Sequence, residues 1–272
     1  MPFTRAADLP SYEQPPVHEV AVGVGFKRLS CWGSIAPGEF RQQVQERYPK
    51  MQDQAPLPPI PVTLGAGQEL EFTDIPPMRR SWYLSDDERT LIQAQDNRLH
   101  VNWRRIQDGD VYPRYEHVLT EFGFALHELQ SFVELRGETV AAVAGEVTYV
   151  NHIVEGALWS DWSDLSGVLA DWLPVPQQAS GAATLVATIG LNAMSEGGLV
   201  SPGHHMSLEL KSAERRTDKS KVLVFQLTNR GAVDSTDFAA LREWCGRASE
   251  DIVRGFTALT SPRAHEYWRR TR

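Results

Sequence analysis

The stretch that decides the fold runs from Asn97 to Leu135 and reads NRLHVNWRRIQDGDVYPRYEHVLTEFGFALHELQSFVEL. From Arg98 to Arg105 apolar and polar side chains alternate, which is the period of a half-buried strand. Residues 107–110 are typical of a turn, and Pro113 suits the first turn of a helix. Apolar side chains then recur every three or four positions and form one stripe of a helix, at Val118, Leu119, Phe122, Leu126, Leu129 and Val133. The stretch therefore predicts a strand, a turn and a helix in succession.

The same succession is predicted again near the C-terminal end of the chain. Val222 begins a strand, residues 229–231 (Asn-Arg-Gly) are typical of a turn, and an apolar stripe predicts a helix from Asp237 to about Leu259. This similarity favours a duplicated unit, with chance spacing as the alternative because such elements vary little in length. Matching positions are each 123 residues apart: Val20 and Val143, Val24 and Val147, Leu99 and Val222, Tyr115 and Phe238.

These patterns predict an α+β protein made of two pseudo-repeated β-α-β-β-β-α units, with mainly antiparallel sheets and helices packed on one side. The first unit is expected at residues 1–138 and the second at residues 139–272, both within one compact domain. In the second unit, Ser163 is expected to cap a helix with Leu165, Leu169 and Trp172 on one face.

Composition and charge narrow the classes of function. The 272 residues carry a net charge of −8, which argues against broad contacts with nucleic acid or an anionic membrane surface. No apolar run approaches the roughly 18 residues of a membrane span, and residues 1–16 lack the apolar core of a signal peptide. Two cysteines, Cys31 and Cys245, fit a reducing compartment. We therefore expect a cytoplasmic protein whose partners include neither a membrane nor nucleic acid.

A proline-rich segment, Ala55-Pro-Leu-Pro-Pro-Ile-Pro61, interrupts the first half of the chain. Such a composition favours the extended polyproline II conformation. The segment is interpreted as a stiff connector. An SH3-type ligand is the alternative, although basic residues do not flank the segment.

The sequence contains no catalytic or metal-binding motif. No serine or cysteine lies in a Gly-x-Ser-x-Gly elbow, and the glycine-rich stretches at residues 65–67 and 197–198 lack the features of a phosphate-binding loop. His204 and His205 are adjacent, and adjacent residues of a strand point in opposite directions, so one ion would rarely bind both. The sequence therefore predicts no catalytic residue, no metal site and no cofactor.

A set of polar and aromatic side chains on or beside the predicted strands stands out. Asparagine is disfavoured in the middle of a strand, yet Asn102 and Asn151 occupy such positions. If the set shares a cleft, amide and guanidinium donors beside aromatic rings would suit a ligand or the backbone of a partner. Alternatively, the Asn and Arg side chains bridge the sheet to loops, and Tyr115 packs its helix. The candidate binding residues are Arg98, Asn102, Arg104, Tyr112, Tyr115, Tyr149 and Asn151.

Several short motifs carry a resemblance to a known family. They are residues 91–98 (Leu-Ile-Gln-Ala-Gln-Asp-Asn-Arg), 101–104 (Val-Asn-Trp-Arg), 112–115 (Tyr-Pro-Arg-Tyr), 149–151 (Tyr-Val-Asn) and 16–20 (Pro-Val-His-Glu-Val). Together they resemble the TIGR04255 family, sporadically distributed bacterial proteins of uncharacterised function. Thr148 stands where similar proteins often have a basic residue. The resemblance supports the predicted order of elements and implies no activity.

Two hypotheses of function follow. The missing catalytic signature and the sporadic distribution favour a soluble, non-catalytic protein that binds another protein of an accessory bacterial system, such as phage defence or toxin control. The alternative is a small-molecule or nucleotide-binding domain, with or without enzymatic activity. Its pocket is expected between the two half-sheets, near Arg98, Asn102 and Asn151. The sequence predicts neither the identity of the partner or ligand nor the oligomeric state.

Overall fold

The computed structural model describes residues 5–62, 78–162, 165–173, 186–191, 200–215 and 218–272. The contacts of the chain divide it into two compact units. Unit 1 comprises Glu19–Val147 and Arg230–Gly246, and unit 2 comprises Pro2–His18, Thr148–Asn229 and Arg247–Arg272. The chain passes from one unit to the other more than once, so neither unit is a continuous stretch of sequence.

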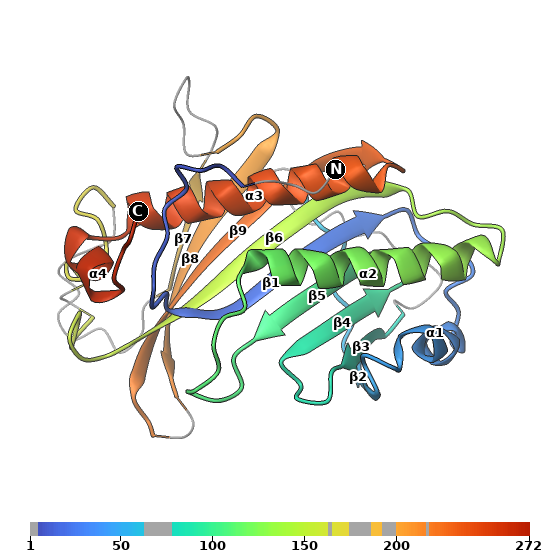
Figure 1. Cartoon of the computed structure of the whole chain (residues 1–272), viewed down its shortest axis with the longest axis horizontal. Coiled ribbons are helices and arrows are strands. Elements are labelled where there is room, and N and C mark those ends of the chain that lie inside the picture. Colours follow the sequence, from blue (N-terminus) through green and yellow to red (C-terminus); the bar gives the residue numbers. More distant parts are fainter. Residues whose placement is uncertain (1–4, 63–77, 163–164, 174–185, 192–199, 216–217) are drawn as a thin grey trace. The chain divides into compact units, whose positions relative to one another are not determined.

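The described residues form nine strands and four helices (Figure 1). The predicted α+β class with a large antiparallel sheet is confirmed, and the order of strands across the sheet is β2-β3-β4-β5-β1-β6-β9-β8-β7. The elements are β1 (Val17–Phe26), α1 (Ala36–Val44), β2 (Lys50–Gln54), β3 (Arg80–Leu84), β4 (Thr90–Gln95), β5 (Arg98–Arg104), α2 (Tyr115–Glu134), β6 (Ala142–Val154), β7 (Val186–Leu191), β8 (His204–Glu214), β9 (Lys221–Ser235), α3 (Phe238–Leu259) and α4 (Pro262–Tyr267).

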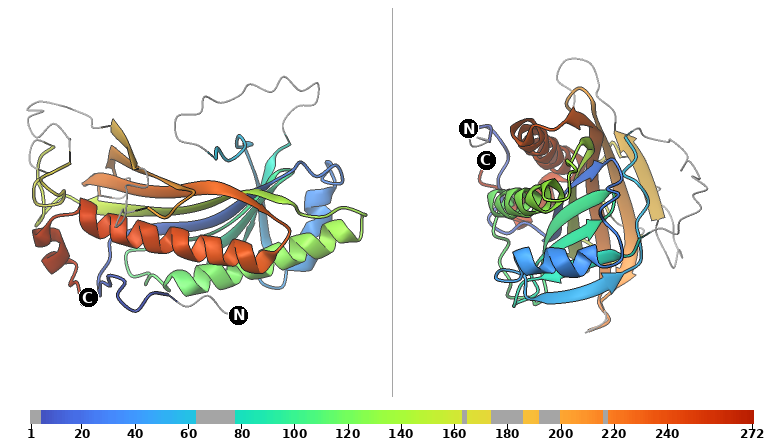
Figure 2. Two further views of the ribbon diagram at one scale, coloured as in Figure 1. Left: turned by 90° about the horizontal axis from the view of Figure 1, so that it is seen from above. Right: turned by 90° about the vertical axis from the view of Figure 1, so that its right-hand side faces the viewer.

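The strand and helix predicted at residues 98–134 are present in unit 1 as β5 and α2. Leu99 and Val101 of β5 are fully buried, as are the apolar side chains of the α2 stripe. β5 pairs antiparallel with β4 on one side and with β1 on the other. Figure 2 shows α1 and α2 on the same face of these strands, and α1 contacts both α2 and β3. The apolar period of the sequence therefore identified the face that packs against the helices.

An aromatic cluster fills the space between α1, α2 and the strands of unit 1. The ring centroid of Phe40 lies 5.6 Å from the ring centroid of Trp32, 5.4 Å from that of Tyr83 and 5.7 Å from that of Phe132. Tyr83 donates its hydroxyl proton to the carbonyl of Pro37 at 2.9 Å, so its polar end is satisfied as well. Burying each such ring contributes about 1.5–3 kcal/mol, which makes this cluster a main source of stability for α1.

A second aromatic cluster lies in unit 2. Phe256 of α3 contacts Phe225 of β9 at 5.5 Å and Trp268 at 5.1 Å between ring centroids. The N-terminus of α4 is capped by Ser261, whose Oγ accepts from the backbone N–H of Ala264 at 3.1 Å. This cap and the Phe256 contact hold the C-terminal residues against the core of unit 2.

The predicted helix with Leu165, Leu169 and Trp172 is absent. Residue 163 lies outside the described residues, and residues 165–173 form turns. Their backbone binds another segment instead of continuing as a helix, since Ala170 donates to the carbonyl of Leu259 and Ser261 donates to that of Val168. The apolar spacing reflects burial of this turn, because Leu165 and Leu169 are buried although no helix forms.

Two further predictions differ from the structure. The turn predicted at residues 229–231 is absent, and these residues continue β9. Asn229 is fully buried there, and its amide donates to Asp251 at 3.0 Å, which replaces the local hydrogen bonds that favour turns. β2 is an additional strand that pairs with β3. In residues 1–138 the order is therefore β-α-β-β-β-β-α, with one strand more than predicted, and between β6 and β7 the described residues form no helix.

We expect Gly23→Ala to destabilise unit 1. A Cβ at position 23 would lie 2.1 Å from Cδ2 of His100, whose ring crosses β1 to reach Glu146. The ring would have to turn away, and losing a hydrogen bond to a charged group costs about 1.5–3 kcal/mol. Gly38→Ala is the matched control, because position 38 of α1 has open space and alanine is favoured in helices by about 1 kcal/mol. Urea unfolding compares the two; equal unfolding free energies would contradict this packing.

Candidate functional site

The polar side chains of β5 lie on the face of the unit 1 sheet that does not pack against α2. Arg98, His100 and Asn102 alternate along β5 with the apolar residues that face α2, and all three are only 4–5% exposed. Small residues face them on the neighbouring strand, which gives the β5 side chains room to extend across β1. These register partners on β1 are Gly25, Gly23 and Ala21.

His100 crosses β1 and binds a carboxylate on β6. Its Nε2 lies 2.9 Å from Oε1 of Glu146, and Nε of Arg230 on β9 donates to the other carboxylate oxygen at 2.5 Å. Burial lowers the pKa of His100 although Glu146 acts in the opposite direction, so the imidazole is neutral at pH 7 and donates its Nε2 proton. Burial by itself raises the pKa of Glu146, but the hydrogen bond from His100 and the charges of Arg230 and Arg98 outweigh it and lower the pKa. Glu146 is thus held as a buried carboxylate.

A second row of hydrogen bonds runs from β3 to β1. The side-chain oxygen of Gln93 on β4 accepts from Trp82 Nε1 at 2.9 Å and from Arg80 Nη1 at 2.7 Å. Gln93 Nε2 donates to Asn102 Oδ1 at 2.7 Å, and Asn102 Nδ2 donates to Oε1 of Glu19 at 2.5 Å. Both ends of the Asn102 amide are therefore used within unit 1, which accounts for an asparagine in the middle of a strand.

Two guanidinium groups lie close to one indole ring on this face. The guanidinium carbons of Arg80 and Arg104 are 5.5 Å and 5.4 Å from the Trp82 ring centroid. Arg104 also donates through Nε to the carbonyl of Glu88 at 3.0 Å. Burial raises the pKa of Glu19, the register partner of Arg104, while the hydrogen bond from Asn102 and the charge of Arg104 act in the opposite direction. Cations beside an aromatic ring suit a planar or anionic group.

The proline-rich segment lies on the same face of unit 1. Gln95 of β4 binds both backbone groups of Leu57: its Oε1 accepts from the N–H at 2.9 Å and its Nε2 donates to the C=O at 3.1 Å. Arg98 donates through Nη1 to the carbonyl of Pro58 at 2.8 Å. Polar side chains of the sheet thus recognise an extended backbone by its N–H and C=O groups, and Arg98 bridges sheet to loop.

Two of the predicted tyrosines belong to the helix-packed side of unit 1. Tyr115 is fully buried at the start of α2 and donates its hydroxyl proton to the carbonyl of Cys245 on α3 at 2.7 Å. The Tyr112 ring lies 5.4 Å from that of Trp103, which follows the apolar period of β5. The structure therefore brings together Arg98, Asn102 and Arg104 but not Tyr115.

The other two predicted residues lie in unit 2. The hydroxyl of Tyr149 is 3.0 Å from Oγ of Ser249 on α3, and Asn151 donates to the carbonyl of Phe225 at 3.1 Å. Both side chains are almost fully buried. Within unit 2 they connect β6 to α3 and to β9.

Unit 2 also holds a buried group of polar side chains that the sequence did not predict. Asp251 of α3 accepts from Ser201 Oγ at 2.8 Å and from Asn229 Nδ2 at 3.0 Å, and its Oδ2 is 2.8 Å from Nδ1 of His204. His204, Asn229 and Asp251 are each no more than 6% exposed. The group fastens the start of β8 to α3. Asn229 and Asp251 are distant in sequence from Ser201 and His204, so no sequence motif predicted the group.

Residues of the unit 1 face that sequence reasoning missed are Glu19, Gln93, Gln95, His100 and Glu146. Gln93 and Gln95 alternate with apolar residues in β4, which is a period-two signal for the face opposite the helices. Glu146 gave no such signal, because its partners come from β5 and β9 and are known only from the sheet.

The described residues include no group of three or more His, Cys, Asp or Glu side chains placed to hold a metal ion. The unit 1 face has a surplus of positive charge, with Arg80, Arg98, Arg104 and Arg230 beside Glu19 and Glu146. Its donors are suited to carbonyl, carboxylate or phosphate oxygens.

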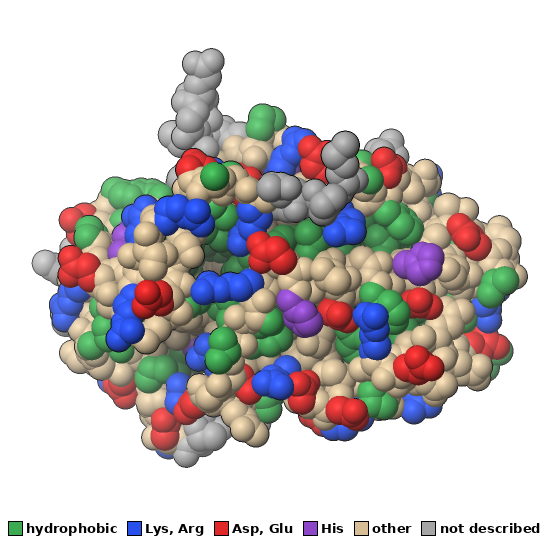
Figure 3. Space-filling model, viewed as in Figure 1, with side chains coloured by type: hydrophobic (Ala, Val, Ile, Leu, Met, Phe, Trp, Pro, Cys, Tyr) green, Lys and Arg blue, Asp and Glu red, His purple; other side chains and the backbone are tan. Residues whose placement is uncertain are grey.

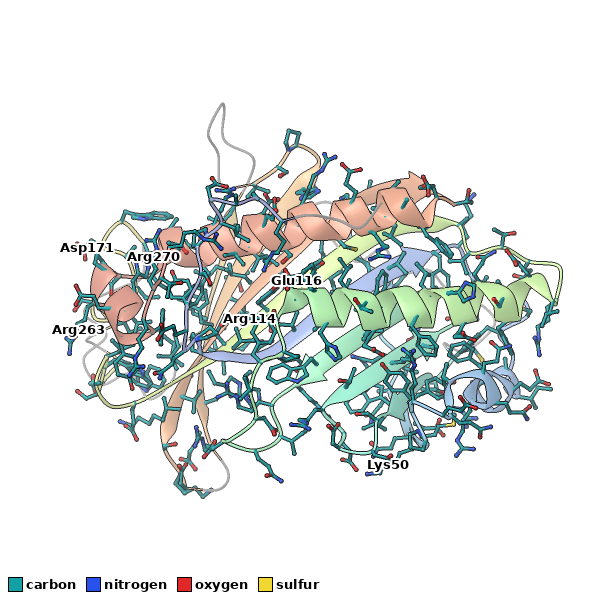
Figure 4. All side chains as sticks on the ribbon, viewed as in Figure 1. Lys50, Arg114, Glu116, Asp171, Arg263 and Arg270 are labelled. Atoms are coloured by element: carbon teal, nitrogen blue, oxygen red, sulfur yellow. The ribbon has the colours of Figure 1, made fainter. Side chains whose placement is uncertain are left out.

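Charges elsewhere on the surface are mixed in sign. Lys50 at the start of β2 lies at the surface in Figure 4, and its Nζ contacts Oε1 of Glu88 at 2.9 Å. Figure 3 shows Lys and Arg side chains interspersed with Asp and Glu over the side on which α2 is seen in front of its strands.

Comparison with models of known protein families finds no match, and no curated protein is significantly similar to the chain. Within the described ranges, no helix is long and apolar enough to cross a membrane. The fold and the site therefore define the class: an α+β protein with a large antiparallel sheet, whose unit 1 carries a buried, guanidinium-rich polar face.

We expect His100 to make the stability of the protein depend on pH. Burial lowers its folded pKa below the usual 6.5, so between these two values only the unfolded chain binds the proton. The free energy of unfolding should fall as the pH drops below about 6.5, by at most about 1.4 kcal/mol per pH unit from this residue. Glu146, with its lowered pKa, adds a second loss below its ordinary value of 4.5.

Urea unfolding of the wild type and of His100→Gln between pH 8 and pH 5 measures the effect. Glutamine retains a donor toward Glu146 but does not titrate, and the other histidines are shared by both proteins. The difference in unfolding free energy between wild type and variant should shrink or reverse as the pH falls from 7 to 5. Parallel curves for the two proteins would show that His100 does not carry this dependence.

Asn102→Ala should lower the free energy of unfolding, because it removes the amide that joins the half-buried Glu19 to the buried Gln93. Each polar group left unpaired costs about 1–3 kcal/mol. Gln107→Ala, in an exposed turn, should change stability by less than about 0.5 kcal/mol and serves as the control. Unfolding followed by tryptophan fluorescence gives both values; an unchanged Asn102→Ala variant would point to a role in direct binding instead.

Proposed function

We propose that this protein is a non-catalytic binding component that acts through a partner protein, and that the polar face of unit 1 recognises extended polypeptide. The observation that carries the proposal is the pair of hydrogen bonds by which Gln95 holds both the N–H and the C=O of Leu57. A side-chain amide that pairs with one residue in this way reproduces the contacts of a neighbouring strand. Arg98 adds a donor for the next carbonyl along the chain.

The chemistry of the face supports binding rather than catalysis. Its carboxylates and its imidazole are bound to one another or to amides within unit 1, as in His100 with Glu146 and Asn102 with Glu19. A general base or nucleophile needs an uncommitted lone pair directed toward substrate. The two cysteines are poor nucleophiles as well, because burial raises the pKa of Cys31 to about 11 and that of Cys245 to about 12, which leaves little thiolate at neutral pH.

The resemblance to the TIGR04255 family extends the proposal to a setting. We infer an accessory bacterial system such as phage defence or toxin control, with the partner encoded in the same system. We also infer a cytoplasmic location, which is supported by the two free cysteines. Internal duplication remains part of this proposal. The strand order supports it, because β1 and β6 are adjacent and are followed outward by β5 and β9, β4 and β8, and β3 and β7.

A second candidate function is binding of a small planar or nucleotide-like anion. The observation that favours it is the position of Arg80 and Arg104 beside the Trp82 ring. An indole ring can stack on a base while guanidinium groups bind phosphate oxygens. The same residues would then act on a small molecule instead of a peptide.

Purification of the tagged full chain from its own host, followed by native mass spectrometry, separates the two candidates. A protein bound in stoichiometric amount supports the leading proposal, whereas a small ligand without a protein supports the second candidate. If the purified chain carries no protein and no small ligand, both candidates are contradicted.

A pair of neighbouring arginines supplies matched variants for this experiment. Arg80 binds Gln93 on the polar face, and Arg79 is exposed and pairs with Asp53 at 3.1 Å. Arg80→Ala should reduce the amount of co-purified partner at least tenfold, and Arg79→Ala should leave it unchanged. Equal loss in both variants would show that the partner recognises surface charge rather than this face. Circular dichroism melting curves confirm that both variants are folded.

A further inference from the structure

We infer that the unit 1 face carrying Gln95 and Arg98 is an exchangeable peptide-binding site. The occupant in this structure is the proline-rich segment at residues 55–61 of the same chain, and the ligand that replaces it is an extended, proline-containing peptide of a partner. The inference rests on the proposed function. It adds the chemical class of the ligand and the means by which access to the binding site is controlled.

The contacts that hold the segment are directed at its backbone. Gln95 binds the N–H and C=O of Leu57, and Arg98 binds the C=O of Pro58. None of these three hydrogen bonds depends on which side chain the bound residue carries. A peptide from another chain can therefore make the same bonds, provided that its residue at the Leu57 position is not proline and retains the N–H donor.

One side chain of the segment is an anchor. Ile60 is 7% exposed, whereas the prolines on either side of it are exposed. The position that a Cβ of Gly25 would occupy lies 3.4 Å from Cδ1 of Ile60 and 3.5 Å from the Cβ of Ala144. Ile60 therefore packs against Gly25 of β1, at a position where even a Cβ would be in ordinary van der Waals contact with it.

The spacing of the two contacts sets the ligand pattern. Leu57 is half-buried and Ile60 is buried, whereas the two prolines between them are exposed, a spacing that fits the three residues per turn of a polyproline II helix. The site therefore selects a bound residue with a free N–H, then two residues that favour the extended form, then an aliphatic residue. Prolines lower the entropic cost of binding because they hold this conformation in advance.

The internal segment does not use every donor of the site. In the described part of the chain, Nε of Arg98 and Nε of Arg80 are buried without a hydrogen-bond partner. Burial also lowers the pKa of Arg98, which shows that its charge is poorly solvated there. A ligand that supplies further carbonyl or carboxylate oxygens to these donors binds better than the internal segment does.

Competition from the internal segment controls access. A tethered segment acts at an effective concentration on the order of millimolar, so a peptide of the same sequence binds the wild-type chain weakly. The apparent dissociation constant equals the intrinsic one divided by the fraction of molecules in which the site is free. Weakening the internal segment should therefore tighten binding of an added peptide.

The test uses a fluorescently labelled peptide with the sequence of residues 54–62 and the full-length chain. Ile60→Ser removes the internal anchor and should bind the peptide at least about tenfold more tightly than the wild type, measured by fluorescence anisotropy. Leu57→Pro is a second variant, in which the N–H bound by Gln95 is lost while the extended backbone is retained. It should act in the same direction and covers the case that Ile60→Ser fails to fold.

Two controls make the result specific. Adding Gln95→Ala to either variant should abolish the gain, and a peptide with serine in place of the isoleucine should bind at least tenfold more weakly. If neither variant binds the peptide more tightly than the wild type does, or if Gln95→Ala has no effect, the segment is a fixed connector and the inference is wrong. In that case a partner co-purified from the host would still support the proposed function. Conversely, if the variants do bind the peptide more tightly but no partner co-purifies, the result supports the peptide site and contradicts the proposed function.

Discussion

The structure of unit 1 depends on the lack of a side chain at Gly23. β1 lies between β5 and β6 in the sheet, and the ring of His100 crosses it to reach Glu146. A carboxylate buried in this way is costly unless it is paired, and Glu146 is paired by the imidazole and by Arg230. One missing Cβ therefore allows a row of hydrogen-bonded polar side chains to extend from β5 across β1 to β6 and β9. The nearby Gly25 packs against Ile60, so small residues of β1 border both the polar row and the proline-rich segment.

The polar face of unit 1 is a network of hydrogen bonds between side chains. Buried donors and acceptors require partners, and here most amides, guanidinium groups and carboxylates find them in one another, with Nε of Arg80 and Nε of Arg98 as exceptions. Such a network favours one arrangement of the strands. Side-chain amides that are fixed in this way are well placed to bind a backbone, since peptide N–H and C=O groups have the same geometry as the amide itself. Gln95 makes this contact with Leu57, and the proposed function extends it to a partner.

Unit 2 also contains a buried histidine paired with a carboxylate. Its buried imidazole, His204, pairs with Asp251 on a helix, and Ser201 and Asn229 complete the shell of the carboxylate. In unit 1 the corresponding pair joins two strands on the face that does not pack against α2. The His204–Asp251 pair joins a strand of unit 2 to a helix. The His100–Glu146 pair joins two strands of unit 1 across β1. Both are buried ion or hydrogen-bond pairs whose loss would leave an unpaired group in the interior.

The sequence by itself determined the elements whose apolar period is long and regular. β5, α2 and α3 were predicted because alternation and the three-to-four spacing are local properties that survive any tertiary arrangement. The antiparallel α+β class followed from them. At residues 165–173 the same reasoning failed, because Leu165 and Leu169 are buried under a turn whose backbone binds the end of α3. At residues 229–231 a turn signal lay inside β9, because Asn229 finds its hydrogen bonds on α3 and not in its own backbone.

For the site, the sequence singled out Arg98, Asn102 and Arg104, since polar residues in the middle of a strand require an explanation. Only the tertiary structure supplied Glu19, Gln93, Gln95 and Glu146 as their surroundings. It also separated Tyr115, whose hydroxyl is used between α2 and α3. The physical reason is that alternation fixes which face a side chain occupies, whereas strand order and register fix its neighbours. Register arises from pairing between segments far apart in the chain, so a period of two residues contains no information about it.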